Sequence, residues 1–425
     1  MANSYLSRTP SSTGNRRTFT ISVWLKRSRI GSPESHITNV NTGNNPYGRI
    51  LFKTDNTLKI DDYDGNQDTN IVTNRIFRDT SAWYHIVVAY DTTQSTASDR
   101  VKIYVNGVQE TSFSTATYPG LNFDTEYNNQ SKAMEIGKFS SNYFEGYMSH
   151  FAMVDGQQLT PTTFGETDST SGIWKFKSPS TTWGTNGVHL KFENSGNLGL
   201  DSSGQGNNYT VNGNLKQSLS TPSNIYGTLS NQIVPWASDT TATNGNTTLT
   251  NPSGSEGTSN VTIGVNTGKW YCEMKQGDSN DVYIGVGAET FISDNLLNAY
   301  SGATHNATTG LLVKHSNGTR YVNGSSSSGI FASTGSGDVT GIALDLDAAT
   351  RTVTFYKNGV VDSAGAQNLP TNMQSGFLFP VCMVLDDSII HLNTGDGFFG
   401  TTAITSAGSN GNGSLFEYDV PTGYY

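Results

Sequence analysis

The feature that most constrains the fold of this chain is a short phrase that occurs once in each half. The two copies are KIYVNGV at residues 102–108 and TFYKNGV at residues 354–360. In both, an Asn-Gly pair follows alternating apolar residues, and Asn and Gly best tolerate the positive φ that a type I′ turn needs. The strands expected before them, 85–91 and 341–347, are also similar. The sequence therefore predicts two tandem domains of related antiparallel architecture.

The composition favours an all-β fold. The 425 residues are too many for one core, and 34% of them are hydrophobic while only 14% are charged. The 46 glycines suit many turns, and 20 Tyr, 19 Phe and 6 Trp supply buried cores, which argues against disorder. Apolar residues recur in short alternating runs rich in β-branched and aromatic side chains, which argues against a helical bundle.

The first domain, residues 1–156, is expected to be a sandwich of two antiparallel sheets. In its first strand, Phe19 and its alternate neighbours are apolar, whereas Thr20, Ser22 and Lys26 point the other way, so one face is expected to be buried. Its strands are expected at 18–26, 49–53, 57–61, 83–91, 100–106, 133–137 and 146–154.

Residues 157–262 are punctuated by prolines and rich in polar turn residues, which predicts a loop-rich connector. The aromatic residues in it indicate that it packs on the sandwiches, because exposed rings would promote aggregation. A second sandwich is expected at 263–400, and the tail, 401–425, is expected to dock through its aromatic residues. The strands of the second sandwich are expected at 269–275, 282–287, 311–314, 340–346, 352–357, 379–385 and 389–393.

Charge and targeting signals limit the partners. The net charge is −10 and no basic stripe is present, so nucleic acid is not expected as a partner. The start lacks a signal-peptide pattern and no apolar run reaches the roughly 18 residues of a membrane span, so we expect synthesis in a cytoplasm and no membrane insertion. Cys272 and Cys382 are expected to be reduced core residues, although pairing between them stays open.

No catalytic constellation is evident, so the chain is not expected to be an enzyme. The closest match to the paired carboxylates of a glycosidase is Glu166-Thr167-Asp168, which lacks the final acid and lies in the connector. The histidines are scattered, and no zinc-binding motif is present. No cofactor is expected, with calcium as the one candidate.

The calcium candidate is the acidic segment 61–68. Oxygen ligands at Asp62, Asp64, Asn66 and Asp68 alternate as in calcium loops. However, Gly65 is misplaced for an EF-hand, and a polar hairpin turn explains the same residues. Both interpretations stay open.

Tyrosines in or beside the expected turns are candidates for ligand contacts. Their rings can stack on sugars or on a partner protein, although each also suits the scaffold. Tyr63, Tyr300 and Tyr321 are the candidate ligand-binding residues, and Tyr118, Tyr127 and Tyr143 lie in similar positions.

The motifs resemble two known families. Residues 19–24 (FTISVW), 83–87 (WYHIV) and 103–107 (IYVNG) resemble strands of laminin-G/concanavalin A-like domains, and 144–161 resembles their closing segment. Residues 268–271 (GKWY), 284–287 (IGVG), 355–359 (FYKNG) and 378–381 (LFPV) resemble a SPRY domain. The resemblance implies two jelly-roll sandwiches of the concanavalin A-like kind.

The whole chain resembles laminin-G-like plus SPRY proteins of tailed phages, many of marine bacteria and cyanophage-like. The segments that carry this resemblance are 4–10 (SYLSRTP), 164–169 (FGETDS) and 416–421 (FEYDVP). It implies a non-catalytic structural protein on the virion surface, as a tail fibre, appendage or capsid decoration.

The implied partners are other virion proteins, further copies of the chain in a homo-oligomer such as a trimer, and a host-surface glycan or protein. Weak sites suffice in such a particle, because many copies act together. Two alternatives stay open: a polysaccharide-degrading enzyme of concanavalin A-like fold, and a SPRY adaptor that binds a peptide.

Overall fold

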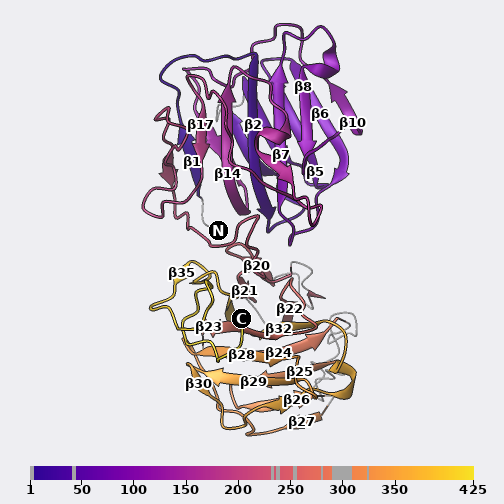
Figure 1. Cartoon of the computed structure of the whole chain (residues 1–425), viewed down its shortest axis with the longest axis vertical. Helices are drawn as coiled ribbons and strands as arrows, with labels where there is room; N and C mark the ends of the chain where they lie inside the picture. The colour runs from indigo at the N-terminus through magenta and orange to yellow at the C-terminus, as the bar shows by residue number, and fades with distance from the viewer. Residues whose placement is uncertain are drawn as a thin grey trace. The chain divides into compact units, whose positions relative to one another are not determined.

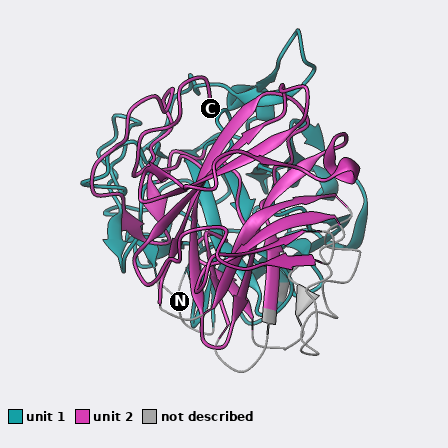
Figure 2. Ribbon diagram, turned by 90° about the horizontal axis from the view of Figure 1, so that it is seen from below, with its two compact units in different colours: residues 1–217, 221–225 teal, residues 218–220, 226–425 magenta. Residues whose placement is uncertain are grey.

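The computed structural model describes residues 4–40, 45–230, 234–235, 240–251, 256–278, 281–289, 309–322 and 325–425. The chain divides into two compact units (Figures 1 and 2). The first consists of Met1–Gln217 and Thr221–Ile225, and the second of Ser218–Ser220 and Tyr226–Tyr425. The expected connector, 157–262, is therefore divided between the two units. No helix among the described residues is long and apolar enough to cross a membrane.

The first unit is a sandwich of an eight-stranded and a six-stranded antiparallel sheet. The eight-stranded sheet has the order β10 (Phe113–Thr117), β6 (Gln67–Ile76), β5 (Thr57–Tyr63), β4 (Tyr47–Phe52), β3 (Ser35–Val40), β11 (Met134–Ile136), β1 (Tyr5–Arg8) and β18 (Thr210–Asn212). The six-stranded sheet has the order β17 (Val188–Leu190), β14 (Gly146–Asp155), β2 (Thr18–Arg27), β7 (Tyr84–Asp91), β8 (Val101–Val105) and β9 (Val108–Gln109). Two short hairpins, β12 (Lys138–Phe139) with β13 (Asn142–Tyr143) and β15 (Gly165–Thr167) with β16 (Trp174–Phe176), and the 3-10 helices η1 (Ala97–Asp99) and η2 (Pro161–Thr163) complete the unit.

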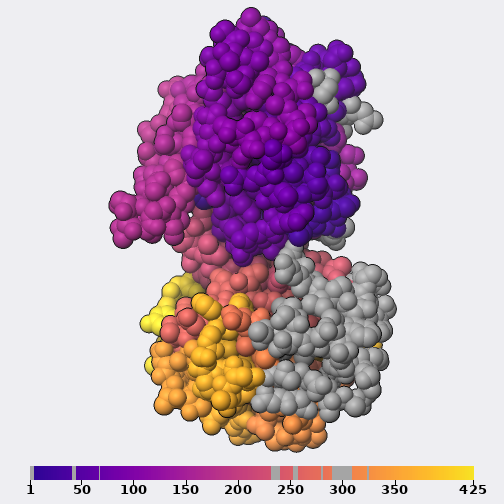
Figure 3. All heavy atoms as spheres, turned by 90° about the vertical axis from the view of Figure 1, so that its right-hand side faces the viewer, coloured from indigo at the N-terminus to yellow at the C-terminus, as the bar shows by residue number. Residues whose placement is uncertain are grey.

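The alternation in β2 is as expected, but the expectation that one of its faces is buried was incomplete, because both are. Phe19 lies in the core between the sheets, where its ring stacks on Tyr90 at 4.6 Å. On the other face, the Thr20 hydroxyl donates to Gln157 O at 2.7 Å and accepts from Leu159 N at 2.8 Å. Residues 157–187, here called the first covering segment, pack on this outer face, where Phe164 is buried among Val87 and Ala152. Figure 3 shows the later residues of the unit (magenta) along one flank.

The second unit has the same plan, with a seven-stranded and a second antiparallel sheet. The seven-stranded sheet has the order β19 (Val234–Pro235), β22 (Glu256–Asn260), β32 (Leu378–Leu385), β24 (Val282–Ala288), β25 (Gly310–Lys314), β26 (Thr319–Val322) and β27 (Ser325–Ser327). The other has the order β20 (Thr241–Thr243), β21 (Thr248–Thr250), β33 (Ile389–Asn393), β23 (Lys269–Gln276), β28 (Val339–Asp345), β29 (Thr352–Lys357) and β30 (Val360–Val361), with β31 (Gln367–Asn368) also on β29. The helix η4 (Thr371–Met373) and the hairpin of β34 (Phe398–Phe399) and β35 (Thr402–Ala403) lie outside these sheets.

The tail, 401–425, packs on the outer face of β23 and β28 and is here called the second covering segment. Its Phe416 and Val420 are buried against Tyr271 and Ala343. Beneath it, the fully buried Glu273 carboxylate accepts the backbone N–H groups of Glu417 (2.8 Å) and Tyr418 (2.9 Å). Cys272 and Cys382 are free thiols, both buried in the core of this unit.

Both Asn-Gly phrases form the predicted hairpins. Asn106 and Gly107 join β8 to β9 with φ of 48° and 82°, and Asn358 and Gly359 join β29 to β30 with φ of 48° and 78°. The positive φ values at both central positions are those of the expected type I′ turn.

Candidate functional site

The outer face of the eight-stranded sheet carries a row of polar side chains that crosses all eight strands. Because the strands are in register, one residue of each strand lies opposite the next, while alternate residues such as Ile50, Ile60 and Ile71 enter the core. From one edge of the sheet to the other, the row is Thr210, Ser7, Glu135, Asn39, Arg49, Asp61, Asn70 and Thr117. We call this outer face the recognition face.

Charged residues form the centre of the recognition face. Asp61 is fully buried between Arg49 and Lys59, and its Oδ2 lies 3.0 Å from Arg49 Nε and 3.1 Å from Lys59 Nζ. The Arg49 guanidinium also lies over two rings, 4.2 Å from the centroid of Tyr47 and 5.0 Å from that of Phe139. The ion pairs and the cation–π contacts hold the arginine in one orientation.

An aromatic pair lies beside this charged centre. Tyr47 on β4 is directly opposite Tyr63 on β5, and the two rings stack with centroids 5.4 Å apart and planes 17° apart. Phe139 meets the Tyr47 ring edge-on at 5.9 Å. Both tyrosines are partly exposed. The result is a partly exposed aromatic surface next to the ion-paired Arg49.

His36 lies beneath Phe139 on the same face. It is fully buried, its ring lies 5.1 Å from that of Phe139, and burial lowers its pKa to about 3. It therefore stays neutral at pH 7.

The predicted calcium ligands lie at the β5–β6 hairpin, but they do not all face one another. Asp62 points into the core, where the Tyr90 hydroxyl donates to it at 2.8 Å and burial raises its pKa to about 7. Asp64 and Asn66 are exposed in the turn, and Asp68 Oδ2 accepts from Asp64 N at 3.2 Å. The hairpin thus brings together Asp64, Asn66 and Asp68, and for these three the calcium hypothesis stays a prediction.

The other predicted contact residues have varied positions. Tyr63 is on the recognition face, whereas Tyr127 is fully buried in the core, which excludes contact with a ligand. In the second unit, Tyr321 on β26 packs on Tyr283 with centroids 5.5 Å apart, and Tyr300 lies outside the described residues. Arg49 and Tyr47 were not among the predicted contact residues, although Tyr-x-Arg and Lys-x-Asp-x-Tyr on neighbouring strands have the alternation of a shared face.

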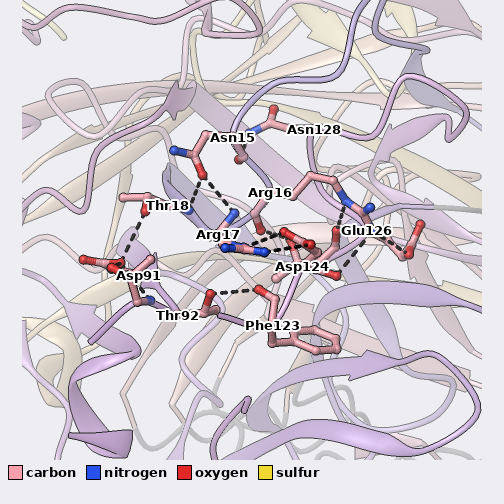
Figure 4. Close-up of polar contacts among 12 residues, drawn as sticks. Asn15, Arg16, Arg17, Thr18, Asp91, Thr92, Phe123, Asp124, Glu126 and Asn128 are labelled. Atoms are coloured by element: carbon pink, nitrogen blue, oxygen red, sulfur yellow. Dashed lines mark hydrogen bonds and ion pairs between the residues drawn. The ribbon is translucent and has the colours of Figure 1, made fainter. Parts of the chain in front are cut away.

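Acidic residues at one end of the first unit are held by arginines (Figure 4). Arg17 Nε donates to Asp124 Oδ1 at 2.8 Å, and this hydrogen bond lowers the pKa of Asp124. Arg16 Nη2 donates to Glu126 Oε1 at 3.0 Å. Both carboxylates are therefore ion-pair partners of arginines.

The connector acids considered as a glycosidase pair are also ion-paired. Lys175 Nζ lies 3.0 Å from Asp168 Oδ2 and 3.6 Å from Glu166 Oε1. Hydrogen bonds from Ser171 and Lys175 lower the pKa of Asp168, which is therefore a carboxylate at neutral pH.

Two family models match separate segments of the chain. Residues 2–163 match the laminin-G model of the concanavalin A-like lectin/glucanase superfamily, and residues 269–397 match the SPRY domain model. A concanavalin A-like domain and a SPRY domain are therefore present in this order, and the predicted fold class of tandem antiparallel β-sandwiches is confirmed. A search of curated proteins found no match.

Solved structures similar to this chain include two SPRY domains and one domain of an arabinanase. The SPRY domain of human HERC1 is 21% identical, and the match covers 36% of this chain and 91% of that domain with a TM-score of 0.29. The PSpry domain of TRIM65 is 18% identical, and the match covers 39% of this chain and 91% of that domain, also with a TM-score of 0.29. Domain 4 of AbnA, an extracellular arabinanase of Geobacillus stearothermophilus in complex with arabinotriose, is 18% identical. The match covers 35% of this chain and 65% of that domain, with a TM-score of 0.24.

Proposed function

We propose that this chain is a non-catalytic recognition protein whose first unit binds an extended glycan along the recognition face. The observation that carries the proposal is the partly exposed Tyr47–Tyr63 stack beside the polar row. Aromatic rings pack on the apolar faces of sugars, and the partly exposed Arg49 and Lys59 next to the stack are the polar groups available to the hydroxyls. Asn39, Asp61 and Glu135 in the row are buried, and Asp61 holds Arg49 and Lys59 in place.

The wider setting that we propose is the surface of a tailed-phage particle. The support is the resemblance of three segments along the chain to such virion proteins, together with the pairing of two binding-type domains. In this setting, a homo-oligomer, for instance a trimer, binds other virion proteins, and many weak glycan sites act together through avidity.

The test is glycan binding by matched variants of the full chain. A glycan array followed by calorimetry on the best ligand is expected to show binding that falls at least tenfold in Tyr63→Ala and in Arg49→Gln. Tyr321→Ala, which removes a partly buried tyrosine of the second unit, is the control and is expected to bind like the wild type. Equal binding by the wild type and all three variants would show that the recognition face is not the glycan site. Release of reducing sugar would contradict the non-catalytic role.

The virion setting has its own test. Particles purified from a culture that produces this chain are labelled with an antibody to it and viewed by negative-stain microscopy. Label at a fixed place on the particle is expected, and unlabelled particles would contradict the setting without affecting the glycan result.

A second candidate function rests on the SPRY match at 269–397. In this case, the second unit binds a peptide segment of a partner protein. A pull-down that recovers one partner, and that survives Tyr63→Ala unchanged, would favour this function over glycan binding.

A further inference from the structure

A pair of histidines lies at the edge of the six-stranded sheet, away from the recognition face. His150 lies on β14 and His189 on the adjacent β17, and their ring centroids are 5.6 Å apart. Two rings of the first covering segment flank the pair: Phe176 stacks on His150 at 3.5 Å and Trp183 on His189 at 5.5 Å. The two imidazoles are therefore held side by side.

Each of the two rings has a buried nitrogen that makes no hydrogen bond. Within the part of the chain that the structure describes, His150 Nδ1 and His189 Nε2 have no partner, and His189 is only 3% exposed. His85, on the same outer face, differs: its Nδ1 accepts from Trp174 Nε1 at 2.9 Å, and its Nε2 lies 2.8 Å from Ser22 Oγ. His36 and His315 also have buried nitrogens without a hydrogen bond, but in this pair two such rings lie side by side. Unsatisfied buried nitrogens require an explanation.

The backbone at this position is unusual as well. His150 has a φ of 49° within an irregularity of β14 between Ser149 and Ala152, and the nearby Phe192 has a φ of 61°. Bulky residues rarely adopt this left-handed conformation, which costs about 1–3 kcal/mol and is concentrated at functional sites. The irregularity gives His150 a direction that a regular strand would not give it.

The spacing of the rings suits a shared metal ion. Zinc binds imidazole nitrogen at about 2.0–2.1 Å, and in a tetrahedral site two such ligands have centroids roughly 5 Å apart. The observed 5.6 Å between the two centroids is close to this separation. Burial also lowers the pKa of both imidazoles to about 4, so each is neutral at pH 7 and has a lone pair for a metal.

We propose that His150 and His189 together bind one divalent transition-metal ion of the zinc, nickel or copper class. The described residues contain no group of three or more His, Cys, Asp or Glu side chains with metal-binding geometry, so water completes the coordination. The charged groups that act on the pair are Glu193 and Asp201, which favour a cation, and Lys191, which opposes it. Metal binding at this site is proposed to be independent of glycan binding on the recognition face.

The test uses the metal-free full chain and one histidine variant at a time. Equilibrium dialysis against Zn²⁺ is expected to show one bound ion per chain, and His150→Asn and His189→Asn are each expected to lose it. The control is His391→Asn, because this half-buried histidine of the second unit already bonds Thr248 Oγ1 at 2.9 Å. It is expected to keep the ion.

Retention of the ion by His189→Asn, or its loss in His391→Asn, would overturn the proposal. Because a variant can fail to fold, a second measurement uses the wild type alone. The electron paramagnetic resonance spectrum with one equivalent of Cu²⁺ is expected to show coupling to two imidazole nitrogens. Coupling to fewer than two would equally overturn it.

Discussion

In each of the two units, the covering segment packs against an Asn-Gly hairpin of the same sequence type. In the first unit Trp174 lies against Gly107, and in the second Tyr418 lies against Gly359; a Cβ atom on either glycine would lie 2.6 Å from the ring. Glycine is therefore needed twice at each hairpin, for its positive φ and for the space that the ring occupies. The Asn-Gly phrase, which the sequence indicates as a turn, is therefore also the point at which the aromatic ring of each covering segment packs.

The units differ in the polar group buried under each covering segment. The first has the neutral base His85, whose pKa burial lowers to about 3, and the second has the acid Glu273, whose pKa burial raises to about 7. Both groups favour their uncharged forms, because a charge without a counterion is costly in the interior. Their effects on stability therefore change with pH in opposite directions.

The largest effect is expected from acid on the first unit. His85 binds its proton more weakly folded (pKa about 3) than unfolded (about 6.5), so its contribution is complete above pH 6.5 and is lost as the pH falls toward 3. The loss amounts to about 5 kcal/mol. We expect wild type to lose that much more stability than His85→Gln between pH 7 and pH 3, as measured by hydrogen exchange of β7 peptides. An equal loss of stability in the wild type and in His85→Gln between pH 7 and pH 3 would show that His85 is not the cause.

The next effect concerns the aromatic residue that fixes the second covering segment. Phe416 is almost completely buried, so Phe416→Ala is expected to destabilise the second unit by about 4 kcal/mol. Hydrogen exchange of β23 peptides measures this change, and exchange in β2 of the first unit is the internal control. Unchanged protection of β23 would show that the tail contributes little.

A smaller effect, of opposite sign to that of His85, is expected at Glu273. Its folded pKa, about 7, exceeds the unfolded 4.5, so its contribution is complete below pH 4.5 and is lost as the pH rises through 7. The loss is about 3 kcal/mol. We expect Glu273→Gln to remove this decline between pH 4.5 and pH 8, as followed by exchange in β23. A decline that persists in the variant would assign it to other groups.

The smallest effects are expected from the hairpin glycines themselves. Gly107→Ala and Gly359→Ala each introduce a Cβ at positive φ, and we expect each to cost about 2 kcal/mol in its own unit. Gly120→Ala is the matched control, since its Cβ would meet nothing within 4 Å. Thermal unfolding of the three variants checks this, and a similar loss in Gly120→Ala would remove the special role of the hairpins.

Much of the fold could be predicted from the sequence, whereas the candidate site could not. The expected strands at 18–26, 269–275 and 352–357 agree with β2, β23 and β29 within a residue or two, because each has apolar alternation and a clear turn signal. The strands β3 and β6 were missed, since their polar residues hide the alternation. The recognition face is made of polar side chains, and a pattern of apolar residues in the sequence cannot identify a polar face.

The two hairpins, the all-β architecture and the apolar faces that form each core follow from the local sequence. Local backbone preferences and a two-residue period are sufficient for these. The burial of the second face of β2 and β23, and the contacts between polar residues, depend instead on how distant segments pack. The polar row joins Ser7 to Glu135 and Thr210, and the covering segments bring Trp174 to His85 and Glu417 to Glu273. These neighbours depend on strand order and register between distant segments, and a linear pattern contains neither.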